Sequence, residues 1–182
     1  SSTAASASSA SSGAAASGKG LSELFTYETS GREIESWNML YSQQAIDFNV
    51  TTNIIDGLIS FDNYGKPVPA LAKSWEHNED STVWTFHLRD DVDWVDMNGE
   101  VQDHLTSKDF LVGFEWVLNA KKNQAANTSM PSTTVVGAAD YYDKTYGMDD
   151  AAGEALTYED MLAAGVGIDA PDDYTVVFTC LN

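Results

Sequence analysis

Positively charged residues are scarce in this chain of 182 residues. Nine lysines and arginines stand against 28 aspartates and glutamates, for a formal net charge of −19. Such a charge opposes binding to nucleic acid and attachment to an anionic membrane surface. The carboxylates are spread along the chain, which favours a soluble, self-repelling surface over a site that steers cationic ligands.

Cysteine and long apolar runs are also rare. The single cysteine, Cys180, excludes a disulfide within the chain, and its apolar surroundings predict a small buried side chain. No apolar run approaches the roughly 20 residues that a membrane-spanning helix needs. The N-terminal stretch has neither the basic region nor the continuous apolar region of a signal peptide.

Common catalytic and cofactor motifs are missing as well. There is no G-x-S-x-G, H-E-x-x-H, C-x-x-C or P-loop pattern, and Gly165-Val166-Gly167 lacks the third glycine of a dinucleotide fingerprint. The acidic run 90–96 does not have EF-hand spacing, and the three histidines include no short-spaced pair typical of zinc sites. We therefore expect no enzymatic activity, no cofactor and no metal. A carboxylate-dependent glycosidase is the enzyme alternative.

The first twenty residues consist of Ser, Ala and Gly with one Thr and one Lys. Such a stretch has too little apolar surface to offset the entropy of ordering, so residues 1–20 are predicted to be a disordered tether. The remainder is long enough for one domain with a hydrophobic core.

Hydrophobic periodicity and capping signals divide this remainder into strands and helices. Strands are predicted at 24–27, 58–61, 174–181 and as a pair within 74–88. Helices are predicted at 47–57, closed by Gly57 in a left-handed conformation, and at 106–118, 135–146 and 157–165. Segments 98–105 and 119–131 are predicted to be loops. The mixture indicates an α/β (α+β mixed) fold.

Between residues 53 and 116 a dozen signals follow one another in a fixed order. This order resembles the oligopeptide- and dipeptide-binding branch, family 5, of the bacterial extracytoplasmic solute-binding proteins that serve ABC importers. Weaker resemblance extends from about Leu24 to the last residue. The residues that carry it are Gly57-Leu58, Asp62, Gly65, Pro69, Leu71-Ala72, Ser74-Trp75-Glu76, Trp84-Thr85-Phe86-His87-Leu88-Arg89, Trp94, Gly99, Thr106 and Asp109-Phe110.

The resemblance implies a fold like that of type II periplasmic binding proteins, present here in part. Residues 21–57 would belong to the first ligand-binding lobe and residues 58–182 to a small second domain truncated at its C-terminus, with the closing lobe absent. In Gram-positive members a lipid-modified cysteine precedes a Ser/Ala/Gly tether. The chain looks as if it begins just after such a cysteine, which implies a lipoprotein on the outer face of the cell membrane.

The resemblance further implies a receptor that captures a peptide by closure of two lobes and delivers it to ABC permease subunits. A surface adhesin or peptide-signal sensor with the same fold is the alternative. Members of the family take peptides, nickel, haem or sugars, and segment 140–164 resembles the longer second domain of the oligopeptide subgroup.

Two segments are implied to face the ligand: the loop 30–47, and the loop after the helix that starts at Thr106. The second segment lacks the aromatic residue common there in the family. Apart from Trp37, the tryptophans, at 75, 84, 94 and 116, are predicted to pack in the core. The candidate ligand-binding residues are Trp37, Ser42, Gln43, Gln44, Ala45, Ala126, Asn127 and Met130.

Overall fold

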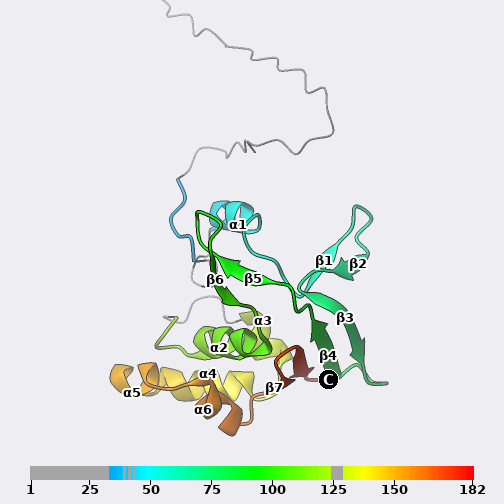
Figure 1. Ribbon diagram of the computed structural model, residues 1–182. Coiled ribbons are helices and arrows are strands. Elements are labelled where there is room, and N and C mark those ends of the chain that lie inside the picture. Colours follow the sequence, from blue (N-terminus) through cyan, green and yellow to red (C-terminus); the bar gives the residue numbers. More distant parts are fainter. Residues whose placement is uncertain (1–32, 39, 41, 43, 124–128) are drawn as a thin grey trace, which may run out of the picture. The chain divides into compact units, whose positions relative to one another are not determined.

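The computed structural model describes residues 33–38, 40, 42, 44–123 and 129–182, and the statements below concern these residues. The chain divides into two units at Gly31 and Arg32, and the described residues all belong to the second unit. Figure 1 shows the order of the elements. The predicted tether 1–20 and the predicted strand 24–27 lie outside the described residues. No helix in the described ranges combines the length and apolar character needed to cross a membrane.

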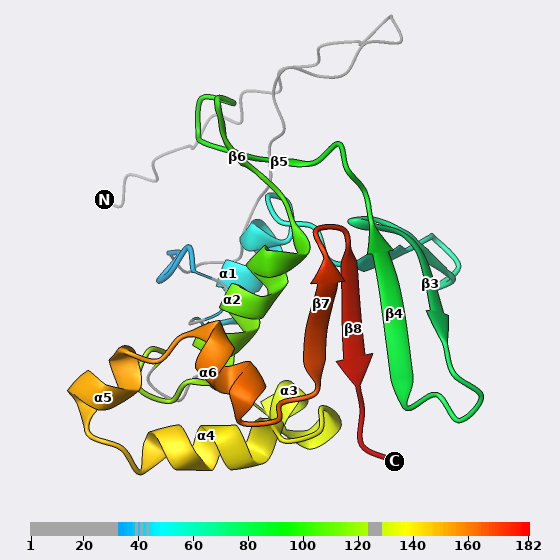
Figure 2. The same ribbon diagram turned by 60° about the horizontal axis from the view of Figure 1, so that its bottom comes forward.

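An antiparallel sheet of four strands forms the centre of the second unit, as Figure 2 shows. Its strand order is β3-β4-β8-β7, and β8 pairs with β4 along its whole length. The strand pair predicted within 74–88 is thereby confirmed, and the predicted strand 174–181 corresponds to β8. The bounds are β3 (Ala72–His77), β4 (Val83–Leu88), β7 (Ile168–Asp172) and β8 (Thr175–Thr179).

The two-residue alternation of β4 and β8 directs apolar side chains toward the helices. Phe86 is the direct cross-strand partner of Val176, and Leu88 and Val176 are fully buried. The Phe178 ring meets the rings of Phe86 and Phe114 edge-on, with centroids 6.0 and 5.7 Å apart. Such aromatic pairs add roughly 0.5–1.5 kcal/mol to the stabilisation from burial.

Helices gather on the β7 side of this sheet (Figure 2). They are α2 (Ser107–Leu118), α3 (Ser129–Thr134), α4 (Ala138–Tyr146), α5 (Asp150–Glu154) and α6 (Tyr158–Ala163). Helix α2 contacts β7 and β8. The core lies between the sheet and these helices. Its buried members are Leu88, Leu111, Leu118, Val135, Ala138, Tyr141, Met161, Val166, Ile168 and Val176.

Both predicted capping boxes are present. The carboxylate of Asp109 accepts a hydrogen bond from the backbone N–H of Thr106 at 2.7 Å, and the carboxylate of Asp160 accepts one from Thr157 at 2.9 Å. These bonds satisfy donors at the start of α2 and α6, which is why the sequence signal located both helices.

Two glycines bring separate backbone segments close together. Gly137 precedes α4 with φ of 70°, and a Cβ at this position would lie 2.6 Å from the carbonyl oxygen of Gly165. Gly165 has φ of 86° but open space where its own Cβ would stand. Because Val135 bridges to Cys180 and Gly137 is left-handed, α4 begins at Ala138 and not at 135 as predicted.

The predicted helix 47–57 is shorter than expected. It forms α1 (Ala45–Thr51), and Gly57 does not have a positive φ, so the prediction that Gly57 closes the helix is wrong. Polar side chains compete for the last carbonyls: Thr51 Oγ1 donates to the carbonyl of Asp47 at 2.9 Å and Asn53 Nδ2 donates to that of Asn49 at 2.8 Å. Such local side-chain bonds favour ending a helix.

Two small hairpins complete the unit: β1 (Ile59–Phe61) with β2 (Pro67–Pro69), and β5 (Asp93–Val95) with β6 (Val101–His104). The prediction that 98–105 is a loop is therefore wrong, because residues 101–104 pair with β5. The predicted loop 119–131 is likewise wrong at its end, where α3 begins at residue 129.

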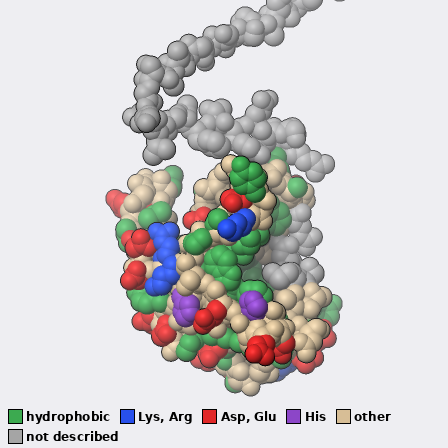
Figure 3. All heavy atoms as spheres, turned by 90° about the vertical axis from the view of Figure 1, so that its right-hand side faces the viewer, with side chains coloured by type: hydrophobic (Ala, Val, Ile, Leu, Met, Phe, Trp, Pro, Cys, Tyr) green, Lys and Arg blue, Asp and Glu red, His purple; other side chains and the backbone are tan. Residues whose placement is uncertain are grey.

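Charge is distributed over the surface as the composition suggested. Figure 3 shows one face on which acidic side chains are spread widely, whereas lysine and arginine side chains gather in two places. Hydrophobic side chains occupy the middle of the same face.

Candidate functional site

The first segment implied to face a ligand is organised by the buried carboxylate of Asp47. Oδ1 accepts the N–H of Glu35 at 2.9 Å, and Oδ2 accepts the N–H of Ser36 at 3.0 Å and the hydroxyl of Ser42 at 2.5 Å. These bonds, above all that from Ser42, hold the pKa of Asp47 below its ordinary value, although burial opposes the shift. The carboxylate thus shapes the loop that precedes α1.

The candidate ligand-binding residues in this loop have different environments. Ser42 is buried, and its hydroxyl both donates to Asp47 and accepts the N–H of Gln44 at 3.1 Å, so it shapes the loop. Gln44 is the half-buried N-cap of α1, Ala45 is its exposed first residue, and Trp37 is exposed. Gln43, Ala126 and Asn127 lie outside the described residues. Met130 belongs to α3, with its side chain outside the description.

An apolar cavity of about 410 Å³ lies beside α2. We call it the apolar groove. Leu40 from the loop before α1 and Pro131 from α3 both line it, so each of the two segments implied to face a ligand contributes a residue. None of the eight candidates is itself among the lining residues. The groove is lined by Leu40, Asp56, Leu71, Trp94, Leu105, Asp109, Phe110, Gly113, Phe114, Val117 and Pro131.

The groove exists because α2 is apolar around more than one side. Leu111 and Leu118 pack into the core. Phe110 and Phe114 pack against its margin and also line the groove, and the buried Val117 lines the groove as well. A helix that buries only one stripe needs fewer apolar residues than α2 has. The excess of apolar residues in α2 was therefore the sequence signal for a second apolar surface. Trp94 also lines the groove and is half-exposed, which contradicts its predicted place in the core.

The volume and lining of the groove match the general character of ligand sites, which are concave, mostly apolar and roughly 300–1,000 Å³ in size. Two carboxylates, Asp56 and Asp109, are among its lining residues. The Asp109 carboxylate already accepts the N–H of Thr106, so it serves the helix cap. The groove therefore offers mainly apolar contact surface, with Asp56 as its second charged member.

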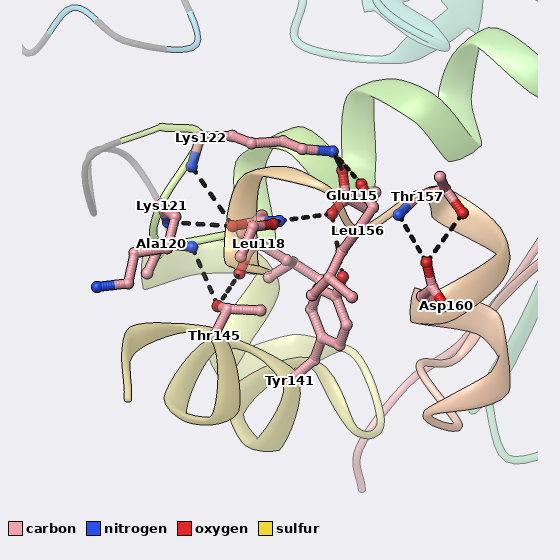
Figure 4. Close-up of polar contacts among 12 residues, drawn as sticks. Glu115, Leu118, Ala120, Lys121, Lys122, Tyr141, Thr145, Leu156, Thr157 and Asp160 are labelled. Carbon is pink, nitrogen blue, oxygen red and sulfur yellow. Dashed lines mark hydrogen bonds and ion pairs between the residues drawn. The ribbon is translucent and has the colours of Figure 1, made fainter. Parts of the chain in front are cut away.

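A second cluster surrounds the buried side chain of Glu115, which is 2% exposed (Figure 4). Its carboxylate receives Lys122 Nζ at 2.7 Å, Asn119 Nδ2 at 2.8 Å and the Tyr141 hydroxyl at 3.0 Å. Burial and the adjacent Glu115 carboxylate raise the pKa of Tyr141, so its hydroxyl stays a donor. Among the described residues no buried side-chain nitrogen or oxygen lacks a partner, and this cluster joins α2 to α4.

Two of the histidines each face one carboxylate. His104 Nδ1 lies 2.7 Å from Asp93 Oδ1, and His87 Nε2 lies 3.7 Å from Glu76 Oε1. Within the part of the chain that the structure describes, no three His, Cys, Asp or Glu side chains are placed to hold a metal ion.

We expect Asp47→Asn to loosen the loop before α1. An amide cannot accept all three donors, so hydrogen exchange at the N–H groups of Glu35 and Ser36 should accelerate about tenfold or more. Because the folded pKa of Asp47 is lowered, its stabilisation is present above the unfolded value of about 3.9 and is lost as the pH falls through the folded pKa.

Hydrogen exchange measured by NMR at neutral and acidic pH checks this expectation. Glu33→Gln, which alters an exposed carboxylate in the same segment, is the control and should leave exchange unchanged. Equal exchange rates in the Asp47→Asn variant and the wild type would show that the carboxylate does not organise the loop.

Comparison with known proteins places these features in context. Residues 66–180 match the family described as bacterial extracellular solute-binding proteins, family 5 Middle. The oligopeptide-binding protein AmiA of Streptococcus pneumoniae is 33% identical over 145 residues, and the oligopeptide-binding protein SarA of Streptococcus gordonii is 30% identical over 145 residues. Each alignment covers 80% of this chain and 19% of the relative, so the chain spans about a fifth of their length.

Solved structures show the same likeness. Haemophilus influenzae OppA, in complex with the peptide RPPGFSPFR, is 28% identical with a TM-score of 0.60, covering 79% of this chain and 24% of that one. The substrate-binding domain of an oligopeptide ABC transporter from Bacillus anthracis is 26% identical with a TM-score of 0.63, covering 84% and 25%. The mixed helices and sheets therefore form part of a fold of the periplasmic-binding-protein type.

Proposed function

The chain belongs to family 5 of the bacterial extracellular solute-binding proteins, and we propose that the full-length protein captures short peptides outside the cytoplasm and delivers them to an ABC permease. The observation that carries the proposal is the 30–33% identity to proteins named as oligopeptide-binding. The relatives compared above are named as oligopeptide-binding proteins, and the groove offers mainly apolar contact. Capture without reaction is the function that fits both.

The proposal includes the domain organisation. Residues 1–20 would tether the protein, residues 21–57 would contribute to a ligand-binding lobe and residues 58–182 to a second domain. A lipid-modified cysteine upstream of the tether would hold the receptor at the outer face of the cell membrane, as in Gram-positive members of the family. Support for the tether comes from its Ser/Ala/Gly composition.

The mechanism would be enclosure of the ligand between lobes. A ligand that binds the closed arrangement more tightly than the open one shifts the population toward closure. Trp37, exposed in the loop that Asp47 organises, would offer an indole surface to the peptide. Gln44 and Ala45, at the start of α1, would lie nearby. Ser42 would act indirectly, by holding the loop against Asp47.

We expect calorimetric titration of the full-length protein with a pool of short peptides to give dissociation constants in the micromolar range or tighter. Residues 1–182 alone should bind much more weakly, because a cleft enclosed from one side loses contacts and leaves the ligand hydrated. The same titration with nickel, haem and sugars tests the other ligands found in the family.

Substitution of Trp37 locates the site. Trp37→Ala should weaken peptide binding about tenfold, as for other exposed aromatic contacts. Tyr64→Ala, at the more exposed tip of the β1–β2 hairpin, should not change binding. The absence of heat with peptides beside a positive sugar or metal titration would overturn the proposal, and so would tight binding by residues 1–182.

A further inference from the structure

The β5–β6 hairpin, residues 93–104, carries exposed apolar side chains outside the apolar groove. Met97 at its tip is 97% exposed, and Val95 and Val101, direct cross-strand partners, are 58% and 62% exposed. Figure 2 shows the hairpin projecting beyond the end of the four-stranded sheet. Grouped apolar side chains on a projecting element are typical of interaction surfaces.

The tip is held in one conformation by Asp96. Its Oδ1 accepts the N–H of Asn98 at 2.8 Å and of Glu100 at 3.0 Å, while its own N–H donates to the carbonyl of Glu100 at 3.0 Å. Gly99 takes φ of 80°, as the turn requires. Met97 is therefore presented by an ordered turn, so little backbone conformational entropy is lost when a partner covers it.

The charges around this apolar tip are negative apart from a histidine and Arg89, whose guanidinium is paired with Asp91 at 2.8 Å. No lysine or arginine occurs between Asp90 and Leu105, and the histidine, His104, is paired with Asp93. A partner that approaches the hairpin meets a negative field, which favours Lys and Arg on the partner. A second copy of this chain, with net charge −19, would be repelled. The carboxylates are Asp90, Asp91, Asp93, Asp96, Glu100 and Asp103.

A hollow of about 160 Å³ lies beside the hairpin, between Val95 and the exposed side chains of Ile54 and Ile55. Two carboxylates, Asp56 and Asp93, are among its lining residues. The hollow can receive one apolar side chain while Asp56 meets a neighbouring cation; Asp93 already faces His104. This combination selects a partner with both kinds of residue.

The β1–β2 hairpin provides an internal comparison. Its turn has the same bonds: Asp62 Oδ1 accepts the N–H of Tyr64 at 2.8 Å and of Lys66 at 2.9 Å, and Gly65 has φ of 75°. Tyr64 is 95% exposed, but Asp62 and Lys66 balance each other's charge. The two tips therefore share a backbone and differ in charge.

We propose that the β5–β6 hairpin is a docking element for a protein partner whose surface places lysine or arginine side chains beside an exposed apolar side chain. The apolar residue enters the hollow or covers Met97, and the cations meet the carboxylates around it. The hollow shares Asp56, Leu71, Trp94 and Leu105 with the apolar groove, but Met97 and Val101 line neither, so contact at these two side chains can be tested apart from the proposed capture of peptides.

Methyl NMR on the full-length protein, labelled at methionine, tests the docking element with a synthetic peptide of alternating lysine and leucine, blocked at both ends. The Met97 methyl resonance should shift on titration, and the affinity should fall as salt is added. The double variant Met97→Ser with Val101→Ser should weaken this binding about tenfold, since two exposed apolar contacts are lost. Tyr64→Ser should bind as the wild type does.

Two comparison peptides test whether both the leucine and the lysine side chains are needed for binding. A lysine–serine peptide should bind more weakly, and a glutamate–leucine peptide should not shift Met97. Equal binding of the lysine–serine peptide, or an unmoved Met97 resonance in the folded wild type, would overturn the proposal. Protection of Met97 from peroxide oxidation in the full-length protein would show instead that its own chain covers the hairpin. Peptides from the transport pool should bind without shifting Met97, which separates this test from that of peptide capture.

Discussion

Gly137→Ala is expected to lower the free energy of unfolding by about 3 kcal/mol or more. The backbone has φ of 70° there, a region that costs L-residues energy, and the added Cβ would meet the carbonyl oxygen of Gly165 at 2.6 Å. Since that oxygen belongs to the backbone, relief requires movement of the segment that connects α6 to β7 or of the start of α4. Urea unfolding of the variant and the wild type measures the difference.

Gly165→Ala is the matched control for this prediction. Its φ of 86° is as unfavourable for alanine, but nothing lies within 4 Å of the Cβ position. The cost should therefore be confined to the backbone conformation, about 1–2 kcal/mol. Equal losses in the two variants would show that the close approach of the two segments is not what requires glycine at 137.

Glu115→Ala should be the second severe substitution, with an expected loss of about 3–5 kcal/mol. The change leaves Lys122 Nζ, Asn119 Nδ2 and the Tyr141 hydroxyl without their common acceptor in a site that water hardly reaches. Breaking a buried ion pair by removing one partner costs far more than the pair contributes at the surface. Urea or thermal unfolding at neutral pH gives the measurement.

Two milder substitutions separate the contributions at this cluster. Glu115→Gln retains an acceptor oxygen of similar position and should lose less than the alanine variant. Tyr141→Phe removes one donor and leaves the carboxylate its other two, at an expected cost of about 1 kcal/mol. An alanine variant as stable as the glutamine variant would mean that the cluster contributes little to the fold.

Local signals in the sequence predicted the elements that local physics decides. The alternation of residues 83–88 and the capping boxes at Thr106 and Thr157 each act within a few residues, and all three are confirmed. The helix end at Thr51 and the strand 101–104 were predicted wrongly. The end of α1 depends on polar side chains that compete with the backbone for carbonyl groups. The strand 101–104 depends on pairing with β5 on the other side of an ordered turn.

The candidate site likewise combines features that local sequence indicates with features that depend on tertiary packing. Resemblance implied two ligand-facing segments, which stay a prediction; the groove receives one residue from each, neither of them a candidate, and its lining depends on tertiary packing around α2. Leu40 and Pro131 have no distinguishing local pattern. The excess of apolar residues in α2 was visible in the sequence. Which of these residues face the core and which line the groove could not be predicted, because that depends on where the core lies around the helix.

The position of β8 in the sheet affects how the chain folds while it is being synthesised. This strand lies between β4 and β7, so β7 has no hydrogen-bonded partner in the sheet until Thr175–Thr179 arrives. A nascent chain that leaves the ribosome residue by residue therefore exposes one edge of β4 and the apolar face of α2 until synthesis passes Thr179. Pairings between such distant segments form late and slowly, and open edges invite aggregation. Until β8 has been made, the sheet therefore remains incomplete, with β4 and β7 lacking the strand that joins them.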